Sequence, residues 1–184
     1  MKTKSLIGAI VGLLVLGILA PVVLSAGGVR GIQKIEGAWI GRVPDTDLQW
    51  TMVMLPKPSG RRASGHGSLD VGFALPPPFG PTDFLSPLLV EAEMTGPETF
   101  DFNVMWYGMR KPAPGSPMTA EIAYIGRDWG TMTFVAPNKM RGVHRIEVYL
   151  PFQDADGDGL PDEGQPPLYT EDLESINTRV PSPR

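Results

Sequence analysis

The sequence contains no cysteine and only two histidines among its 184 residues. Without thiols, the chain has no disulfide framework, no cysteine nucleophile and no attachment point for the acyl groups of a lipoprotein. His66 and His144 lie far apart in the sequence, and no Gly-x-Ser-x-Gly motif is present, so neither a zinc site nor a serine-hydrolase triad is indicated. The sequence therefore favours a non-catalytic protein over an enzyme.

A surplus of positive charge is also missing, since 16 basic residues face 20 acidic ones. Residues 27–153 hold 12 basic and 12 acidic side chains, whereas residues 154–184 hold 2 basic and 8 acidic. The chain offers no basic stripe for a phosphate backbone, which argues against nucleic acid as a partner. Its acidic C-terminal part suits cations instead.

The longest apolar run lies at the N-terminus. Lys2 and Lys4 precede an apolar stretch over residues 6–24, and Ser25-Ala26 follow it. This is the pattern of an export signal, so we expect a signal peptide over residues 1–26 and a secreted or periplasmic mature protein. The alternative is an uncleaved membrane anchor, because the 19 residues 6–24 are long enough to span a bilayer. Pro21 favours cleavage.

Apolar and polar residues alternate over most of the chain from residue 35 to residue 150, which is the pattern of half-buried strands. The period-two pattern and the turn residues predict strands at 35–43, 48–55, 62–73, 88–95, 99–107, 119–125, 131–136 and 142–150. Two proline-rich loops, at 75–87 and 110–117, and a turn at 127–130 separate some of them. No segment after residue 26 has a strong helical period.

Eight strands joined mostly by short turns predict an all-β fold, an antiparallel eight-stranded meander closed into a barrel. Closure removes the exposed edges of an open sheet. A two-sheet β-sandwich is the alternative, because strand pairing is not visible in one sequence. The expected organisation is a signal peptide (1–26), a barrel domain (27–153) and an acidic tail (154–184).

The tripeptide Gly37-Ala38-Trp39 on the first expected strand resembles the Gly-x-Trp signature of lipocalin-type barrels. In that family the tryptophan plugs the closed end of the barrel, and an arginine from near the last strand covers it. The resemblance implies these two roles for Trp39 and Arg145, with Arg141 as the alternative arginine. It also implies a small apolar ligand held in the barrel mouth.

Large side chains on the inward faces of the expected strands are the candidate lining of a ligand site: Trp50, Met52, Phe100, Phe102, Trp106, Tyr124 and His144. The alternative is that these side chains only fill the core. The protein would then be a non-catalytic scaffold or adhesion module at the cell surface, with a surface protein or polymer as partner. A cavity of about 300 Å³ or more favours the carrier, and a packed interior favours the scaffold.

Residues 154–163 carry carboxylates at loop positions 1, 3, 5 and 9 and a glycine at position 6. Such spacing forms an oxygen cage that suits Ca²⁺, and it resembles the calcium loops of thrombospondin type 3 repeats, EF-hands and dockerins. The expected cofactor is Ca²⁺, and the expected ligands are Asp154, Asp156, Asp158, the Leu160 carbonyl, Asp162 and Glu163. Gln165 stands where an EF-hand has glutamate. The alternative is a solvated acidic linker that binds nothing.

Overall fold

A computed structural model describes residues 31–58, 60–70, 75–76, 78–79 and 82–181. The expected signal segment therefore lies outside the described residues. Within them, no helix combines the length and the apolar character needed to cross a bilayer. The segments of secondary structure are β1 (Gly37–Arg42), β2 (Gln49–Pro56), β3 (Arg62–Leu69), β4 (Phe84–Leu85), β5 (Leu88–Met94), β6 (Thr99–Arg110), β7 (Glu121–Ala136), β8 (Lys139–Tyr149), the 3₁₀ turn η1 (Pro151–Gln153) and β9 (Tyr169–Arg179).

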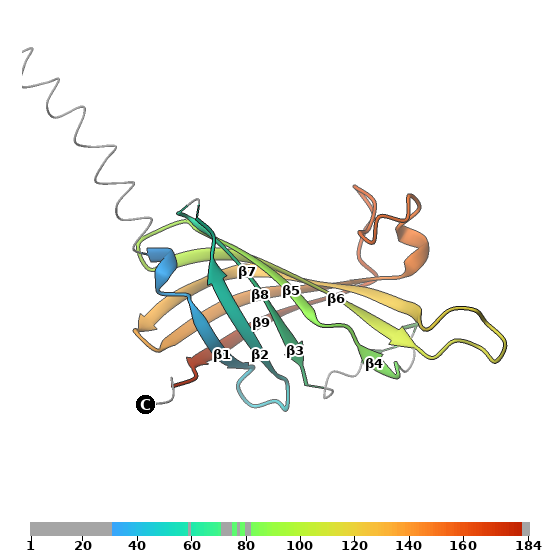
Figure 1. Ribbon diagram of the computed structural model, residues 1–184, viewed down its shortest axis with the longest axis horizontal. Helices are drawn as coiled ribbons and strands as arrows, with labels where there is room; N and C mark the ends of the chain where they lie inside the picture. Colours follow the sequence, from blue (N-terminus) through green and yellow to red (C-terminus); the bar gives the residue numbers. More distant parts are fainter. Residues whose placement is uncertain (1–30, 59, 71–74, 77, 80–81, 182–184) are drawn as a thin grey trace, which may run out of the picture.

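The strands form one antiparallel sheet that closes on itself (Figure 1). Their order is β6-β5-β3-β2-β1-β9-β8-β7, and β7 pairs back onto β6. The two-residue strand β4 adds to β6 outside this ring. The predicted closed, eight-stranded antiparallel barrel is thus confirmed, and the sandwich alternative is excluded.

The barrel uses a different eighth strand from the one expected. Residues 121–136 form a single strand, β7, so the predicted turn at 127–130 is wrong. The ring is completed by β9, which pairs with β1 on one side and β8 on the other. The expected barrel boundary at residue 153 is therefore corrected, since the acidic segment 154–184 supplies a barrel strand. Inward-facing Leu173, Ser175 and Asn177 alternate there with the outward residues Asp172, Glu174, Ile176 and Thr178.

One end of the barrel is closed by Trp39, whose side chain is fully buried. Its indole N–H donates to the Ile35 carbonyl at 2.8 Å, in a helical turn that precedes β1. The guanidinium of Arg179 lies 4.5 Å from the centre of the Trp39 ring and donates to the carbonyls of Lys34 and Glu36. A tryptophan plug covered by a late arginine is therefore present, but the arginine is Arg179.

Arg145 does not occupy the position expected for the covering arginine. It faces outward from β8, where its guanidinium pairs with Asp172 at 2.8 Å and lies over the Trp129 ring. The alternation of β8 explains the difference, because His144 and Ile146 occupy the inward positions on either side of it. Arg141 has the same outward parity on this strand.

Phe79 closes the opposite end of the barrel. Its buried ring packs edge-on against Tyr124 at 6.1 Å and Tyr169 at 6.5 Å between ring centres. Tyr169 and Arg179 are the first and last residues of β9, so the two plugs lie at opposite ends of that strand. Arg110 donates to the Phe79 carbonyl at 2.8 Å.

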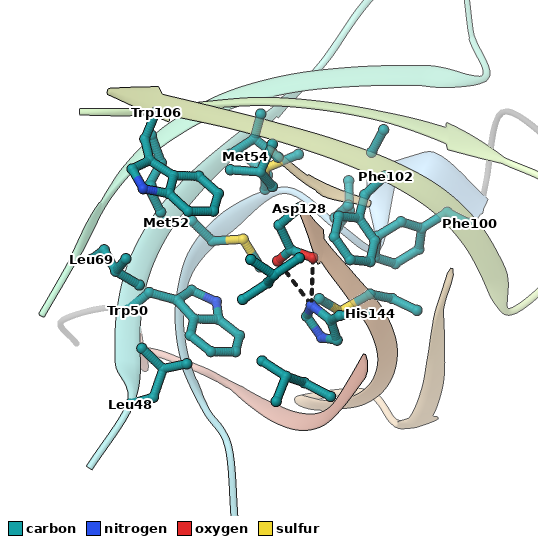
Figure 2. A pocket seen from close by; sticks show the side chains of 18 residues that line it. Leu48, Trp50, Met52, Met54, Leu69, Phe100, Phe102, Trp106, Asp128 and His144 are labelled. Carbon is teal, nitrogen blue, oxygen red and sulfur yellow. Dashed lines mark hydrogen bonds and ion pairs between the residues drawn. The ribbon is translucent and has the colours of Figure 1, made fainter. Parts of the chain in front are cut away.

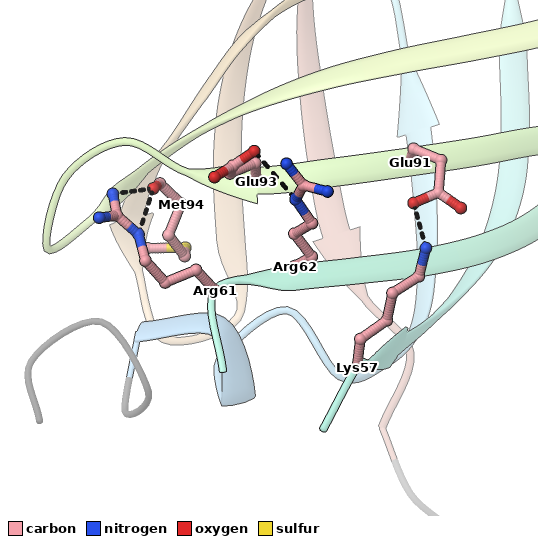
Figure 3. Close-up of polar contacts among 6 residues, drawn as sticks. All are labelled: Lys57, Arg61, Arg62, Glu91, Glu93 and Met94. Carbon is pink, nitrogen blue, oxygen red and sulfur yellow. Dashed lines mark hydrogen bonds and ion pairs between the residues drawn. The ribbon is translucent and has the colours of Figure 1, made fainter. Parts of the chain in front are cut away.

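Two ion pairs lie on the outer wall at β5 (Figure 3). Arg62 on β3 pairs with Glu93, its cross-strand partner on β5, at 3.1 Å, and Lys57, just after the end of β2, pairs with Glu91 at 2.6 Å. All four side chains are exposed, so each pair contributes only about 0.2–1 kcal/mol. The two glutamates point to solvent, as the alternation of this strand predicts.

Candidate ligand cavity and candidate metal loop

The interior of the barrel contains a cavity of about 50 Å³. Sixteen of the eighteen side chains on its wall are apolar or aromatic, and the other two are Asp128 and His144 (Figure 2). The wall consists of Ile35, Leu48, Trp50, Met52, Met54, Leu69, Leu88, Val90, Ala92, Phe100, Phe102, Val104, Trp106, Asp128, Met132, His144, Ile146 and Leu173.

Six of the seven residues proposed as ligand lining lie on this wall: Trp50, Met52, Phe100, Phe102, Trp106 and His144. The seventh, Tyr124, is buried but packs against Phe79 at the end of the barrel. Burial raises the pKa of the Tyr124 hydroxyl, and the nearby Trp106 indole lowers it by a smaller amount. That these side chains contact a ligand stays a prediction.

Asp128 is the site residue that sequence reasoning missed. It points inward from the middle of β7 and accepts a hydrogen bond at 3.0 Å from Nδ1 of His144 on β8 (Figure 2). The polar sequence Arg127-Asp128-Trp129-Gly130 predicts a turn, so the inward position of Asp128 on a strand was not predicted. The signal that was available is alternation, since Asp128 lies four residues before Met132 and therefore shares its side of the strand.

The hydrogen bonds continue from His144 onto β9. The imidazole Nε2 is bonded to the Ser175 hydroxyl, and the Asn177 amide donates to the same hydroxyl oxygen at 3.1 Å. Gly142 permits this meeting, because a Cβ there would lie 2.5 Å from Nε2 of His144 and 2.7 Å from the Ser175 oxygen. The four polar side chains thus form a chain across β7, β8 and β9.

An amide nitrogen only donates, so the Ser175 oxygen accepts from Asn177, and the same hydroxyl is bonded to Nε2 of His144. On the other side of the ring, Nδ1–H of His144 donates to the Asp128 carboxylate. In this arrangement both imidazole nitrogens are occupied, and lone pairs of the Asp128 carboxylate remain available to the cavity.

The order Asp128–His144–Ser175 matches that of a nucleophilic triad, in which a carboxylate orients a histidine that activates a hydroxyl. The Ser175 side chain, however, does not lie on the cavity wall, and the residue is only 2% exposed. A nucleophile must reach the substrate, so we assign Ser175 a hydrogen-bonding role.

The acidic loop between η1 and β9 gathers three carboxylates. Oxygen atoms of Asp154, Asp156 and Asp162 lie within 4.8 Å of one another, so this cluster could hold a metal ion. Asp158 and Glu163 are exposed and do not belong to the cluster. The Asp158 carboxylate accepts instead from the backbone N–H of Leu160 at 2.8 Å.

The loop is fixed to the barrel from two sides. Buried Gln153 donates to the Pro166 carbonyl at 2.8 Å, and its own carbonyl accepts from the N–H of Asp162 at 2.7 Å. The hydroxyl of Tyr107, on the outer wall at β6, donates to the Gly159 carbonyl at 3.1 Å. The acidic cluster is therefore held against the barrel by bonds that do not involve its own carboxylates.

No protein-family model matches the chain. No characterised protein matches its sequence. Among solved structures, it is similar to EF1p2_mFAP2b bound to DFHBI, with 16% identity over 83% of this chain and 99% of that chain and a TM-score of 0.45. The redesigned β-barrel b11L5F_LGL has 12% identity over 83% and 96% of the two chains, with a TM-score of 0.43. The redesigned β-barrel mFAP1, bound to DFHBI, has 11% identity over 82% and 99%, with a TM-score of 0.43.

Proposed function

We propose that the protein binds a small, largely apolar molecule inside the barrel. The observation that carries this proposal is the cavity inside the barrel, with sixteen apolar side chains on its wall and a hydrogen-bonded polar pair, Asp128 and His144. Transfer of apolar surface from water into such an interior is favourable by about 25 cal/mol per Å². The polar pair would orient the ligand.

The size of the cavity limits the ligand. A free volume of about 50 Å³ is well below the ~300–1,000 Å³ of pockets that hold drug-sized molecules. The ligand therefore has few heavy atoms, or it makes room by moving flexible side chains. Met52, Met54 and Met132 on the wall suit that adjustment, because a thioether chain has three rotatable bonds and packs in many shapes.

Native mass spectrometry of the protein purified from its own source tests this proposal. We expect a retained small molecule in the wild-type protein and none in Ala92→Leu, which adds bulk to the cavity wall. Leu89→Phe is the matched control, because Leu89 lies on the same strand but is 58% exposed on the outer face. Absence of any bound molecule in the wild type, before and after incubation with small apolar compounds, would contradict the proposal.

A scaffold function is the second candidate, and two observations favour it. The cavity is below the volume of about 300 Å³ that would favour a carrier. Large apolar side chains are also exposed around the acidic loop: Phe152 (73%), Leu160 and Leu168. Exposed apolar side chains can bind a partner protein where they form a contiguous patch. An empty cavity together with partner binding that is lost in Phe152→Ser would favour this function.

We also propose that the ion held by the acidic loop is Ca²⁺, because carboxylate and carbonyl oxygens are its preferred ligands. Asp154, Asp156 and Asp162 would bind it, and Asp158, the Leu160 carbonyl, Glu163 or water would complete the shell. An affinity of about 10⁻⁴–10⁻³ M is expected, as in extracellular modules. That range fits a secreted or periplasmic location, which the N-terminal sequence supports.

Isothermal titration with calcium tests the loop. Uptake of calcium at millimolar concentration is expected in the wild type, and its loss is expected in the double variant Asp154→Asn, Asp156→Asn. Asp172→Asn is the control, since that carboxylate lies on the outer face of β9 and pairs with Arg145. No calcium uptake by the wild type would leave the loop as a solvated linker.

A further inference from the structure

We propose that the ligand of the barrel is an organic cation: a small protonated amine on an apolar or aromatic body, whose ammonium group binds the Asp128 carboxylate. This inference rests on the proposed function and specifies its ligand class. It starts from the observation that the Asp128 carboxylate, a strong hydrogen-bond acceptor, lies on a wall that is otherwise almost entirely apolar.

The first step concerns the hydrogen bonds of the carboxylate. An ionised carboxylate has about four lone-pair positions that can accept hydrogen bonds. Within the described part of the chain, the Asp128 carboxylate accepts from one donor group, Nδ1 of His144. The Asp128 side chain is 17% exposed, and it lies on the cavity wall. A largely buried carboxylate with unused lone pairs is stabilised by a ligand that brings N–H donors.

The second step concerns charge. No lysine or arginine lies on the cavity wall, and Asp128 is the one carboxylate among its eighteen residues. A second carboxylate, Glu171, shares the inward side of β9 with Leu173 and lies two strands from Asp128 in register, with Ile146 between them. The Glu171 carboxylate accepts from the Tyr169 hydroxyl at 2.5 Å. The interior therefore favours a cationic ligand over an anionic one.

The third step concerns the aromatic rings around the polar pair. The rings of Phe102 and Trp50 lie 4.9 and 5.7 Å from the His144 ring between centres. Figure 2 shows the Asp128 carboxylate directed at the same imidazole. An ammonium group bound at Asp128 would thus lie beside an imidazole that two aromatic rings contact, and aromatic rings attract cations, while the remaining wall accepts its apolar body.

The test compares amines with neutral molecules of the same shape. Binding of benzylamine and of benzyl alcohol to the full chain is measured by titration calorimetry at neutral pH, and so is binding of the smaller pair isobutylamine and isobutanol. We expect each amine to bind about tenfold or more tightly than its alcohol, since charge-assisted hydrogen bonds are roughly twice as strong as neutral ones. Asp128→Asn should reduce this preference to about twofold or less while alcohol binding is kept.

Asp172→Asn is the matched control. It removes an outward-facing carboxylate on β9, two strands from Asp128 in the same sheet, and the preference for amines should persist. Equal binding of amine and alcohol by the wild type, or a preference that survives in Asp128→Asn, would overturn the inference but leave the proposed function standing. Failure of all four compounds to bind would overturn both. The ratio in the wild type remains a test even if Asp128→Asn does not fold.

Discussion

Trp39 and Arg179 contact each other at the end of the barrel opposite Phe79. The indole is fully buried and hydrogen-bonded, and the guanidinium covers its face while it donates to two backbone carbonyls. The arginine thus fixes the end of β9 to the turn before β1. Both residues are expected to matter for stability.

Replacement of Trp39 by alanine should lower the free energy of unfolding by about 3–5 kcal/mol, because a large buried ring is lost and a cavity remains. The control is Trp129→Ala, which removes a ring that is 38% exposed on the outer face of β7 and should cost about 1 kcal/mol or less. Urea denaturation measures both values. A cost below about 1 kcal/mol for Trp39→Ala would contradict its role as a plug.

The same measurement distinguishes the two arginines. Arg179→Ala should destabilise the protein by about 1–3 kcal/mol through the lost ring contact and the unpaired carbonyls. Arg145→Ala removes an exposed ion pair with Asp172 and should change stability by less than about 1 kcal/mol. The reverse order would indicate that Arg145 holds the structural role implied by the lipocalin resemblance.

Two tyrosines, at the last residue of β8 and the first residue of β9, make the stability of the fold depend on pH in the alkaline range. Burial, with a further contribution from the hydrogen bond to a neighbouring glutamate, raises the pKa of Tyr149 and of Tyr169 from 10.0 to about 12. The raised pKa means that folding favours the protonated phenol. The stabilisation that comes from the protonated phenols is fully present below pH 10.0 and is lost as the pH rises through about 12.

Thermal unfolding measured at a series of pH values should show a loss of stability between pH 10 and pH 12. The loss should become smaller in the double variant Tyr149→Phe, Tyr169→Phe, which has no phenol at these positions to ionise. An identical decline in the variant would assign the effect to other groups.

At the scale of single elements, β7 runs through Gly130, a residue that the sequence predicts to lie in a turn. A Cβ on Gly130 would lie 2.0 Å from the Val143 carbonyl oxygen, so the glycine permits close approach of β7 and β8. We expect Gly130→Ala to cost about 1–3 kcal/mol through overpacking. Gly96→Ala is the control in the urea experiment, because the nearest atom to its Cβ would be 3.5 Å away.

The acidic loop lies between two neighbouring strands of the ring, β8 and β9, and not beyond the last strand. Removal of calcium is expected to loosen residues 154–167 while the barrel persists, because Gln153, Tyr107 and the β8–β9 pairing hold the loop ends independently of metal. Hydrogen exchange with and without a chelator measures this change. Faster exchange throughout β9 would show instead that the metal is needed to close the barrel.

At the scale of the whole molecule, closure of the barrel depends on β9, a strand that lacks the regular alternation of apolar and polar residues. A chain that ends at residue 167 would leave β1 paired only with β2 and β8 paired only with β7, and it would remove Ser175 and Asn177 from the interior. We expect this truncated chain to be unfolded or aggregated, because unpaired strand edges associate. Circular dichroism measures the outcome, and a synthetic peptide of residues 168–181 should restore the fold in part.

The sequence predicted the barrel where apolar residues alternate regularly, as in β5 and β6 with their buried Val90, Phe100 and Phe102. It failed at β9, because Ser175 and Asn177 are polar residues that point inward and are paired by hydrogen bonds inside the barrel. It failed at Asp128 for a related reason, since its partner His144 lies on another strand. Pairing of this kind depends on strand register, which a single sequence does not display.

The pairing of Trp39 with Arg179 joins residues that are 140 positions apart, the difference between 179 and 39. During synthesis, the first seven strands of the ring are made before β9, so the barrel closes only after its last strand has left the ribosome. Contacts between residues so far apart in the sequence form slowly. The edges of β1 and β8 that face β9 therefore stay unpaired until that strand arrives.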